Sequence, residues 1–343
     1  MRKIIAGLLV AVFLAAGCSF STSKQTTPEA VQKTSLLPGQ IGGPTLTPFQ
    51  PLLPTATPGP TNTPQPSATP TLLPTPTLVN SIHLGLPRPA GQINILIMGS
   101  DFRPGQGFRT DTLMVLSLNP EKGTASLVSF PRDLYVSIPG LGLSRINAAY
   151  PSGGFQAVVE TFKDNFDITL DYYIMTNFNG FKSIVDTLGG INVYAGTDLY
   201  DKCDLPQAVD KYCYISAGAN FMDGATALWY VRSRYTTNDF DRTRRAQEVL
   251  AALFQKAMSL DAVNRGAELY QLFITSVETN LDTATVLKIL PFASQLIANQ
   301  SLVKRFTISP SNVINYIVPE NGYMVLIPDP VSISEIIRQA FFQ

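Results

Sequence analysis

The sequence predicts an α/β fold in which a mixed central β-sheet carries helices on both faces, preceded by a disordered tether rich in proline and threonine. Over residues 91–343, short runs of β-branched residues alternate with segments whose apolar residues recur at helical spacing, as expected of a sheet covered by helices. Fifteen of the 26 prolines fall between residues 19 and 90, and such a segment cannot bury enough apolar surface to order itself. The folded part is therefore expected to span residues 91–343.

The composition excludes several classes of protein. Hydrophobic residues make up 45% of the chain and charged residues 15%, which excludes a fibre, a wholly disordered chain and a polytopic membrane protein. The 25 basic residues are balanced by 25 acidic ones, so no overall basic field exists to hold nucleic acid. Any binding of anions must therefore be local.

Three strands open the folded part. Residues 93–98 form a nearly continuous apolar run that ends at Gly99, as expected of a strand buried on both faces. Residues 112–118 and 124–130 repeat this pattern on either side of the turn-forming segment 119–123, which predicts a hairpin. The pattern then predicts a helix over 154–166, a strand over 172–177, a helix over 178–188 and a strand over 191–194.

Helices dominate the C-terminal part. The clearest helix spans residues 241–260, and two more are expected over 263–278 and 284–299. The last of these is expected to be interrupted at Pro291, because proline has no backbone N–H to donate. Strands over 303–308 and 323–327 and a final helix over 332–342 complete the prediction.

The N-terminus predicts export and anchoring. Basic residues precede an apolar run over 4–16, which is too short to span a bilayer core of about 30 Å and is typical of a secretory signal. The run ends just before Cys18 and resembles the lipobox of bacterial lipoproteins, so residues 1–17 are expected to be removed and Cys18 to be lipidated. The alternative is an ordinary signal peptide with a chance cysteine. Residues 18–90 would then link the membrane anchor to an extracytoplasmic domain.

Two cysteines remain beyond Cys18. Cys203 and Cys213 form an even pair in an exported chain, which favours a disulfide. A metal site at these residues is improbable, because there is no CxxC and His83, the only histidine, lies at the end of the tether.

The folded part lacks the groups for several common chemistries. It has no histidine, so a Ser-His-Asp or Cys-His arrangement is excluded, and it has no phosphate-binding glycine motif after a strand. Clustered arginines stand out instead, and guanidinium groups suit phosphate because they form bidentate, charge-assisted hydrogen bonds. The cluster comprises Arg232, Arg234, Arg242, Arg244 and Arg245, and Arg109 and Arg132 each lie beside a strand end.

Helical geometry separates these arginines. On the helix over 241–260, Arg242 and Arg245 lie on or beside the apolar stripe, where they would be inward cations that need an anion. Arg244 and Gln247 are expected to point away from the stripe. Arg232 and Arg234 share a side only if their segment is extended. The alternative is that the arginines form surface ion pairs with Asp223, Asp239 and Asp241.

Two carboxylates favour a ligand site over surface ion pairs. Asp101 follows the first strand and Asp111 precedes the second, so both can meet in the crevice where strands end. Two carboxylates beside arginines suit Mg²⁺, which binds few protein oxygens together with substrate phosphate, and Mn²⁺ can take its place. The alternative is that both residues merely cap turns.

A series of motifs in order resembles the LytR-CpsA-Psr (LCP) family. The similarity covers about residues 91–258, a motif-bearing core, and leaves 259–343 as a C-terminal extension of the same domain. The motifs are the segments 94–101, 109–112, 129–133, 147–150, 171–173, 185–190, 223–224, 230–234 and 241–245.

The resemblance implies an extracytoplasmic, Mg²⁺-dependent phosphotransferase. It would move a glycopolymer, such as teichoic acid or capsule, from a polyprenyl pyrophosphate carrier to peptidoglycan. By matching positions, Asp101 and Asp111 would hold the metal, with Asp101 the better candidate for the general base. Arg109 would also serve catalysis. The arginines that would hold the pyrophosphate are Arg109, Arg132, Arg232, Arg234, Arg242 and Arg245.

The chain departs from the family at two places. A lipid anchor and tether replace the usual transmembrane helix, and Ala246 occupies the position of a family glutamine. Gln247 lies about 100° further round the helix and cannot simply substitute for it. Two alternatives stay open: a protein that binds polyprenyl phosphates, and a pyrophosphatase without transferase activity. A transcriptional regulator is opposed by the signal segment and by the absence of a basic stripe.

Overall fold

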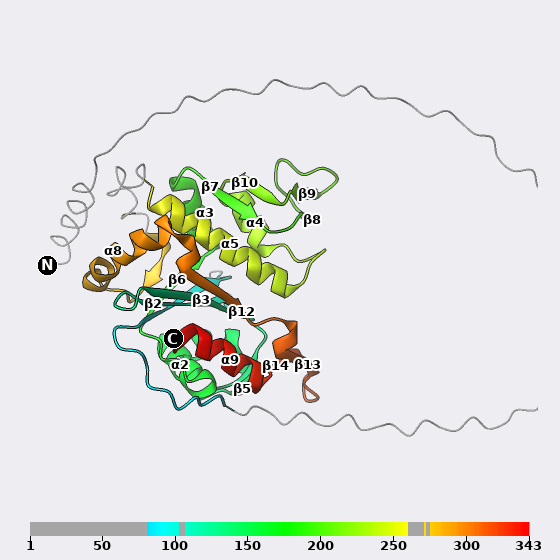
Figure 1. Ribbon diagram of the computed structural model, residues 1–343. Helices are drawn as coiled ribbons and strands as arrows, with labels where there is room; N and C mark the ends of the chain where they lie inside the picture. The colour runs from blue at the N-terminus through cyan, green and yellow to red at the C-terminus, as the bar shows by residue number, and fades with distance from the viewer. Residues whose placement is uncertain (1–80, 103–106, 260–270, 272–274, 343) are drawn as a thin grey trace, which may run out of the picture. The chain divides into compact units, whose positions relative to one another are not determined.

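The computed structural model describes residues 81–102, 107–259, 271 and 275–342. Its centre is a mixed six-stranded sheet with the order β11-β6-β1-β2-β3-β12 (Figure 1). The pairs β1–β2, β2–β3 and β11–β6 are antiparallel, whereas β1–β6 and β3–β12 are parallel. The strands are β1 (Ile93–Ser100), β2 (Thr110–Asn119), β3 (Thr124–Phe130), β6 (Tyr172–Asn177), β11 (Glu278–Thr279) and β12 (Val303–Thr307).

Helices α2 (Ala149–Phe166) and α9 (Pro330–Phe341) cover one face of this sheet (Figure 1). Leu96 and Met98 of β1 point to this face because alternate residues of a strand share a side, and both belong to the same buried core as Phe162 and Ile337. Helix α2 begins earlier than the sequence predicts and is kinked at Gly154, whose φ of 63° favours glycine. Small hairpins extend this side. They are β4 (Tyr135–Ile138) with β5 (Gly142–Arg145) and β13 (Val313–Ile317) with β14 (Met324–Pro328).

Helices α3 (Phe178–Thr187), α5 (Asp239–Ala257) and α8 (Thr283–Ala298) lie on the opposite face (Figure 1). Ile93 and Ile95 of β1 point to this side and pack in one cluster with Phe292 and Leu296 of α8. The expected interruption at Pro291 is wrong, because α8 runs through it as one helix. Burial of the Phe292 and Leu296 side chains stabilises α8 by more than the single backbone hydrogen bond that Pro291 removes.

A smaller unit with its own core packs against α5. Its elements are β7 (Ile191–Ala195), β8 (Leu199–Lys202), β9 (Tyr212–Ile215), β10 (Gly218–Met222) and α4 (Gly224–Arg232). Of these elements, the sequence pattern predicts only β7. Cys203 and Cys213 are joined by a disulfide beside the β8–β9 hairpin, with their Cα atoms 5.7 Å apart. Three short 3₁₀ helices complete the described elements: Ile146–Ala148, Gln300–Leu302 and Pro310–Asn312.

Packing begins before residue 91, where the sequence analysis placed the end of the linker. Ile82 is buried in the core with α2, and its backbone N–H donates to the carbonyl of Asn165 at 3.0 Å. Arg88 forms an ion pair with Asp171. The folded part therefore begins at Ile82 or earlier, because the side chain of Ile82 packs in the apolar core against α2.

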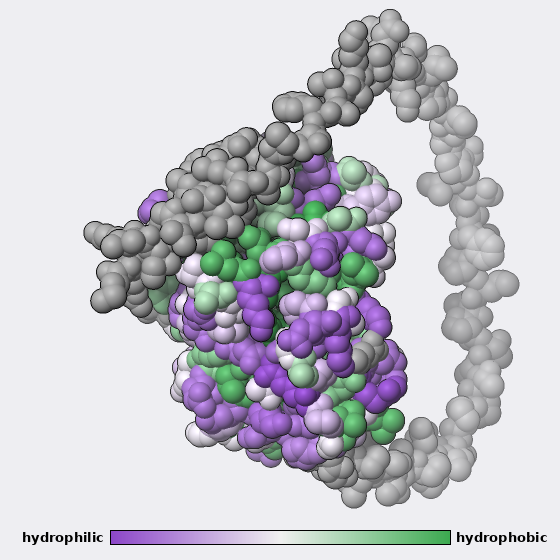
Figure 2. Space-filling view, turned by 60° about the vertical axis from the view of Figure 1, so that its left-hand side comes forward, coloured by the Kyte–Doolittle hydropathy of each residue, from purple (hydrophilic) through white to green (hydrophobic). Residues whose placement is uncertain are grey.

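Several predictions fall outside the described residues. They are the signal peptide over 1–17, lipidation at Cys18, most of the linker and most of the helix expected over 263–278. Among the residues that are described, none of the helices has the length and apolar character needed to cross a membrane. The face shown in Figure 2 is largely hydrophilic, with apolar residues in separate patches.

Candidate functional site

A pocket opens where β1 and β6 end and β2 begins. This main pocket has a volume of about 390 Å³ and lies between the sheet and helices α3, α4 and α5. One part of its wall is charged, formed by Asp101, Asp111, Arg132, Arg232, Arg234 and Arg242. The rest is mostly apolar and includes Ile97, Ile174, Leu228, Val249 and Leu253. Six of the eight side chains that the sequence proposed for the site therefore line one pocket.

A β-bulge positions Asp111. In the β1–β2 ladder, Gly99 pairs with Thr112 and Ser100 pairs with Thr110, so Asp111 has no partner on β1. Such an extra residue bends the strand and redirects its side chain, which is why bulges recur beside active sites. The bulge places the Asp111 carboxylate in the wall of the main pocket.

Asp101 lies at the other end of the loop that joins β1 to β2. Its backbone N–H donates to the carbonyl of Arg109 at 3.1 Å, and its Oδ1 accepts the N–H of Arg109 at 2.7 Å. Asp101 thus caps the loop, as expected if it stabilises a turn. It also lines the main pocket. One carboxylate oxygen closes the loop, and Oδ2 forms no hydrogen bond with the described residues.

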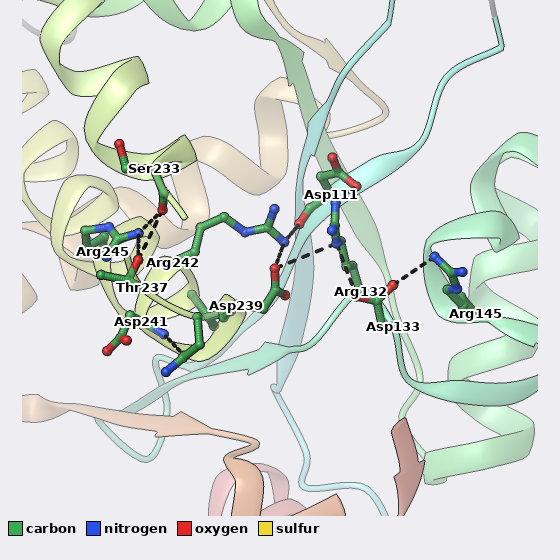
Figure 3. Close-up of polar contacts among 12 residues, drawn as sticks. Asp111, Arg132, Asp133, Arg145, Ser233, Thr237, Asp239, Asp241, Arg242 and Arg245 are labelled. Carbon is green, nitrogen blue, oxygen red and sulfur yellow. Dashed lines mark hydrogen bonds and ion pairs between the residues drawn. The ribbon is translucent and has the colours of Figure 1, made fainter. Parts of the chain in front are cut away.

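Arg132 joins the carboxylates at the pocket wall (Figure 3). Its Nη1 lies 2.9 Å from Oδ1 of Asp111, and its Nε lies 3.4 Å from Asp133 and 3.8 Å from Asp239. Burial alone would lower the pKa of Arg132, but the three carboxylates outweigh burial and raise it. Arg132 is therefore a fixed positive charge at the edge of the pocket.

Arg242 reaches the same place from the first turn of α5. It pairs with Asp239 at 2.6 Å, and its Nη2 donates to the backbone carbonyl of Asp111 at 3.4 Å. Burial lowers the pKa of Arg242, and the neighbouring charges of Arg132 and Arg234 lower it further, although Asp239 opposes them. Arg132 and Arg234 thus repel Arg242 despite the nearby carboxylates, and a bound anion would relieve this repulsion.

Arg232 and Arg234 lie on the same side of their segment. Helix α4 ends at Arg232, and Ser233 has a ψ of 131°, so the chain is extended where the sequence analysis required it. The guanidinium of Arg232 lies 4.2 Å from the centre of the Phe178 ring. Both arginines are exposed, and neither forms an ion pair within the described part of the chain. Their charges are available to a ligand.

Arg245 is placed differently from the sequence expectation. Its side chain is only 1% exposed and does not line the main pocket. Its Nε donates to the carbonyl of Tyr230 at 2.8 Å, and its Nη2 donates to the carbonyl of Ser233 and to Oγ1 of Thr237. Figure 3 shows Arg245 directed to Ser233 and Thr237, and Arg242 directed to Asp111 and Arg132. Arg245 is an inward cation, as expected. Its partners, however, are backbone carbonyls at the end of α4 and not an anion.

Two further expectations on α5 are resolved. Gln247 was expected to point away from the buried side, yet it is 6% exposed, and its Nε2 donates to Oγ of Ser129 at 2.7 Å and to the carbonyl of Phe306 at 2.9 Å. The expectation was wrong because the sheet and the smaller unit both bury α5. Ala246 lines the main pocket where the family has glutamine. Arg244 pairs with Glu248, as predicted.

Arg109 stands apart from the other arginines. Its side chain is exposed and does not line the main pocket, and only its backbone contacts Asp101.

An apolar cavity of about 260 Å³, the inner cavity, lies behind the main pocket. The two share Ile97, Ile174 and Leu250 in their walls, so they adjoin each other between the sheet and α5. Helix α8 closes the inner cavity with Ile289, Ala293 and Leu296, among others. The family resemblance implies apolar helices that enclose a polyprenyl chain, and the apolar character of residues 284–299 is the signal of this cavity in the sequence itself.

The carboxylates of the main pocket fit Mg²⁺ better than a metal with an all-protein site. In the described ranges, no group of three or more His, Cys, Asp and Glu side chains gathers to hold a metal. Asp101 and Asp111 alone suit Mg²⁺, which typically keeps waters and binds one or two carboxylates plus substrate phosphates.

Comparisons with known proteins identify the family of this chain. The LytR_cpsA_psr family model matches residues 74–340. The polyisoprenyl-teichoic acid–peptidoglycan teichoic acid transferase TagU of Bacillus subtilis is 33% identical over 191 residues, which are 55% of this chain and 60% of TagU. TagT of the same organism, a transferase of the same description, is 29% identical over 214 residues, 61% of this chain and 66% of TagT. Each alignment thus spans less than two thirds of the relative.

Solved structures share the fold. The crystal structure of Bacillus subtilis TagV superposes with a TM-score of 0.60 and 26% sequence identity, covering 73% of this chain and 96% of that one. The crystal structure of Bacillus subtilis TagU superposes with a TM-score of 0.55 at 26% identity, covering 72% and 94%. The mixed sheet with helical layers therefore occurs in proteins of known structure.

Proposed function

Because this chain belongs to the LytR_cpsA_psr family, we propose that it transfers a glycopolymer from a polyprenyl pyrophosphate carrier to peptidoglycan, outside the cytoplasm and with Mg²⁺. The curated relatives TagU and TagT are named as teichoic acid transferases, which makes a teichoic acid or a similar glycopolymer the favoured cargo.

One observation carries the proposal. The main pocket combines four arginines and two carboxylates with apolar side chains in its wall, and the apolar inner cavity adjoins it. A lipid pyrophosphate has the same order of parts, a charged head followed by an apolar chain. Charge-assisted hydrogen bonds from Arg132, Arg232, Arg234 and Arg242 would hold the head, and burial of prenyl units between the sheet and α5 would hold the tail.

The chemistry follows from these positions. Asp101 and Asp111 would hold Mg²⁺, which supplies charge neutralisation at the phosphates when bound. A sugar hydroxyl of peptidoglycan attacks the phosphorus that carries the glycopolymer, and a new P–O bond forms. The P–O bond to the lipid phosphate breaks, and the arginines stabilise the charge that develops on the departing oxygen. Asp101 accepts the hydroxyl proton at Oδ2.

Replacing Arg232 by alanine tests the head-group site. We expect Arg232→Ala to weaken binding of a polyprenyl pyrophosphate by roughly 1.5–3 kcal/mol, because one charge-assisted contact is lost. Calorimetric titration with a short-chain prenyl pyrophosphate measures this change. Arg244→Ala is the matched control, since Arg244 is engaged by Glu248 outside the pocket and its loss should leave affinity unchanged. Equal losses for the two variants would contradict the assignment.

A transfer assay separates the proposed activity from its alternatives. The full-length protein is incubated with a lipid-linked glycopolymer, peptidoglycan and Mg²⁺, and labelled glycopolymer on peptidoglycan is counted. Release of free glycopolymer phosphate without attachment would identify a pyrophosphatase, and binding without turnover would identify a carrier-binding protein.

We also propose that a lipid on Cys18 anchors the protein to the membrane, with the Pro/Thr-rich segment as its linker. The lipobox-like sequence supports this anchor. Cys18→Ser should release the protein from the membrane fraction, as followed by fractionation and blotting. Retention of the variant with unchanged mobility would contradict the anchor.

A further inference from the structure

A second depression, the side groove, adjoins the main pocket. It has a volume of about 550 Å³ and lies between α4 and the β8–β9 hairpin. Arg232, Arg234 and Leu228 line both depressions. A ligand whose phosphates lie between the two arginines can therefore extend into both.

The side groove differs from the main pocket in its chemistry. Besides the arginines, its wall carries two lysines, two carboxylates and two aromatic side chains: Lys182, Lys202, Asp201, Asp204, Trp229 and Tyr235. The Tyr235 side chain is 66% exposed, and the ammonium of Lys202 lies 3.6 Å from the centre of its ring. Exposed aromatic surface beside charged hydrogen-bonding groups suits a sugar ring, which presents apolar C–H faces and polar hydroxyls, and offers little to a prenyl chain.

Hydrogen bonds fix the walls of the groove. Asp201 is 1% exposed, and its two carboxylate oxygens accept the backbone N–H groups of Lys202 at 2.7 Å and Tyr235 at 3.0 Å. Trp229 Nε1 donates to the carbonyl of Lys202 at 2.8 Å, and the disulfide begins at the next residue, Cys203. The groove is therefore preformed, which lowers the entropic cost of binding a flexible ligand.

The order of parts in the donor selects the occupant. In a lipid-linked glycopolymer the pyrophosphate stands between the prenyl chain and the first sugar. If the chain enters the apolar interior and the arginines hold the pyrophosphate, the sugar leaves the phosphates on the side of the charged rim. Arg232 and Arg234 connect that rim to the side groove.

We propose that the side groove binds the sugar attached to the donor's pyrophosphate, with Tyr235 against the sugar ring. The inference rests on the proposed function, because it takes the lipid pyrophosphate as the ligand of the main pocket. It makes Tyr235 and Lys202 selective for the glycan end of the donor, whereas the residues of the main pocket bind the parts that all such carriers share.

Two ligands and two variants test this inference. The ligands are farnesyl pyrophosphate, which has no sugar, and farnesyl pyrophosphoryl N-acetylglucosamine, and binding to the full-length protein is measured by calorimetry. Tyr235→Ala should weaken the sugar-bearing ligand about fivefold and leave farnesyl pyrophosphate unchanged, because only the sugar contacts the ring. Tyr235→Phe, which keeps the ring, should restore most of the affinity. Tyr194→Ala is the control, since this tyrosine is 75% exposed on β7 and lines neither depression.

Other outcomes overturn the inference in distinguishable ways. Equal weakening of both ligands by Tyr235→Ala would mean that the tyrosine acts on the pyrophosphate. No change for either ligand would place the donor sugar elsewhere, and a raised KM for peptidoglycan in the transfer assay would then assign the groove to the acceptor. If the unmodified protein binds neither ligand, the proposed function itself fails.

Discussion

Replacing Asp111 by asparagine should lower metal-dependent glycopolymer transfer at least about a hundredfold while the protein stays folded. Asparagine has the same shape as aspartate and tolerates the bulge between β1 and β2, but it lacks the charge that a divalent cation needs. The variant also loses the ion pair with Arg132, whose other carboxylate neighbours, Asp133 and Asp239, remain. Transfer rate and melting temperature are measured on the same sample.

Asp133→Asn provides the matched control. Asp133 also lies against Arg132 and pairs with Arg145, yet it does not line the main pocket. Its removal should therefore alter the surroundings of Arg132 without loss of the metal requirement. If Asp111 only stabilised the turn, Asp111→Asn would lower the melting temperature and keep normal activity per folded molecule. Full activity of the unmodified protein in EDTA would also refute the metal mechanism.

Replacing Arg245 by alanine should cost about 3 kcal/mol of folding free energy and lower the melting temperature by roughly 6–12 °C, while the folded protein keeps its affinity for pyrophosphate. The substitution removes three hydrogen bonds and opens a cavity. It leaves the carbonyl of Tyr230 without its guanidinium donor and leaves the carbonyl of Ser233 with only the 3.5 Å contact from Oγ1 of Thr237. Denaturant titration measures the stability, and calorimetry below the transition measures binding.

The contrast with Arg232→Ala makes this result diagnostic. Arg232 is exposed at the main pocket, so its loss should weaken binding and leave stability nearly unchanged. Arg245 should show the reverse. A variant at Arg245 that keeps its stability and loses pyrophosphate affinity would restore the role that the family resemblance implied and contradict the contacts described above.

Much of the site could be predicted from the sequence. Strand ends are marked by apolar runs that stop at polar residues, so the positions of Asp101 and Asp111 at one crevice followed from topology alone. Arg232 and Arg242 came from the density of arginines over residues 232–245, and Arg132 came from its position beside a strand end. The bulge itself was not predictable, because a one-residue shift in register leaves no mark on the hydrophobic pattern.

The errors share a physical origin. A helical wheel gives the direction of a side chain but not what lies in that direction. Arg245 was correctly placed inward, yet the end of α4, itself not predicted, supplies its carbonyl partners. Gln247 was expected outward because only one buried side was assumed for α5, whereas β3 and β12 bury a second. The sequence pattern predicts a break in the helix at Pro291, but tertiary packing keeps α8 continuous through this residue.

The stretch of chain after residue 258 adds a strand and part of an apolar wall to the domain. It contributes β12, which pairs with β3, and α8, which closes the inner cavity through Ile289 and Leu296. None of the charged residues of the main pocket comes from this stretch. All charged residues of the main pocket thus precede residue 259, whereas the apolar wall of the inner cavity is built from both parts of the chain. Substitutions in α8 that enlarge or shorten the inner cavity would change which prenyl chain lengths bind best without touching a phosphate ligand, and affinities for a series of prenyl pyrophosphates would record that shift.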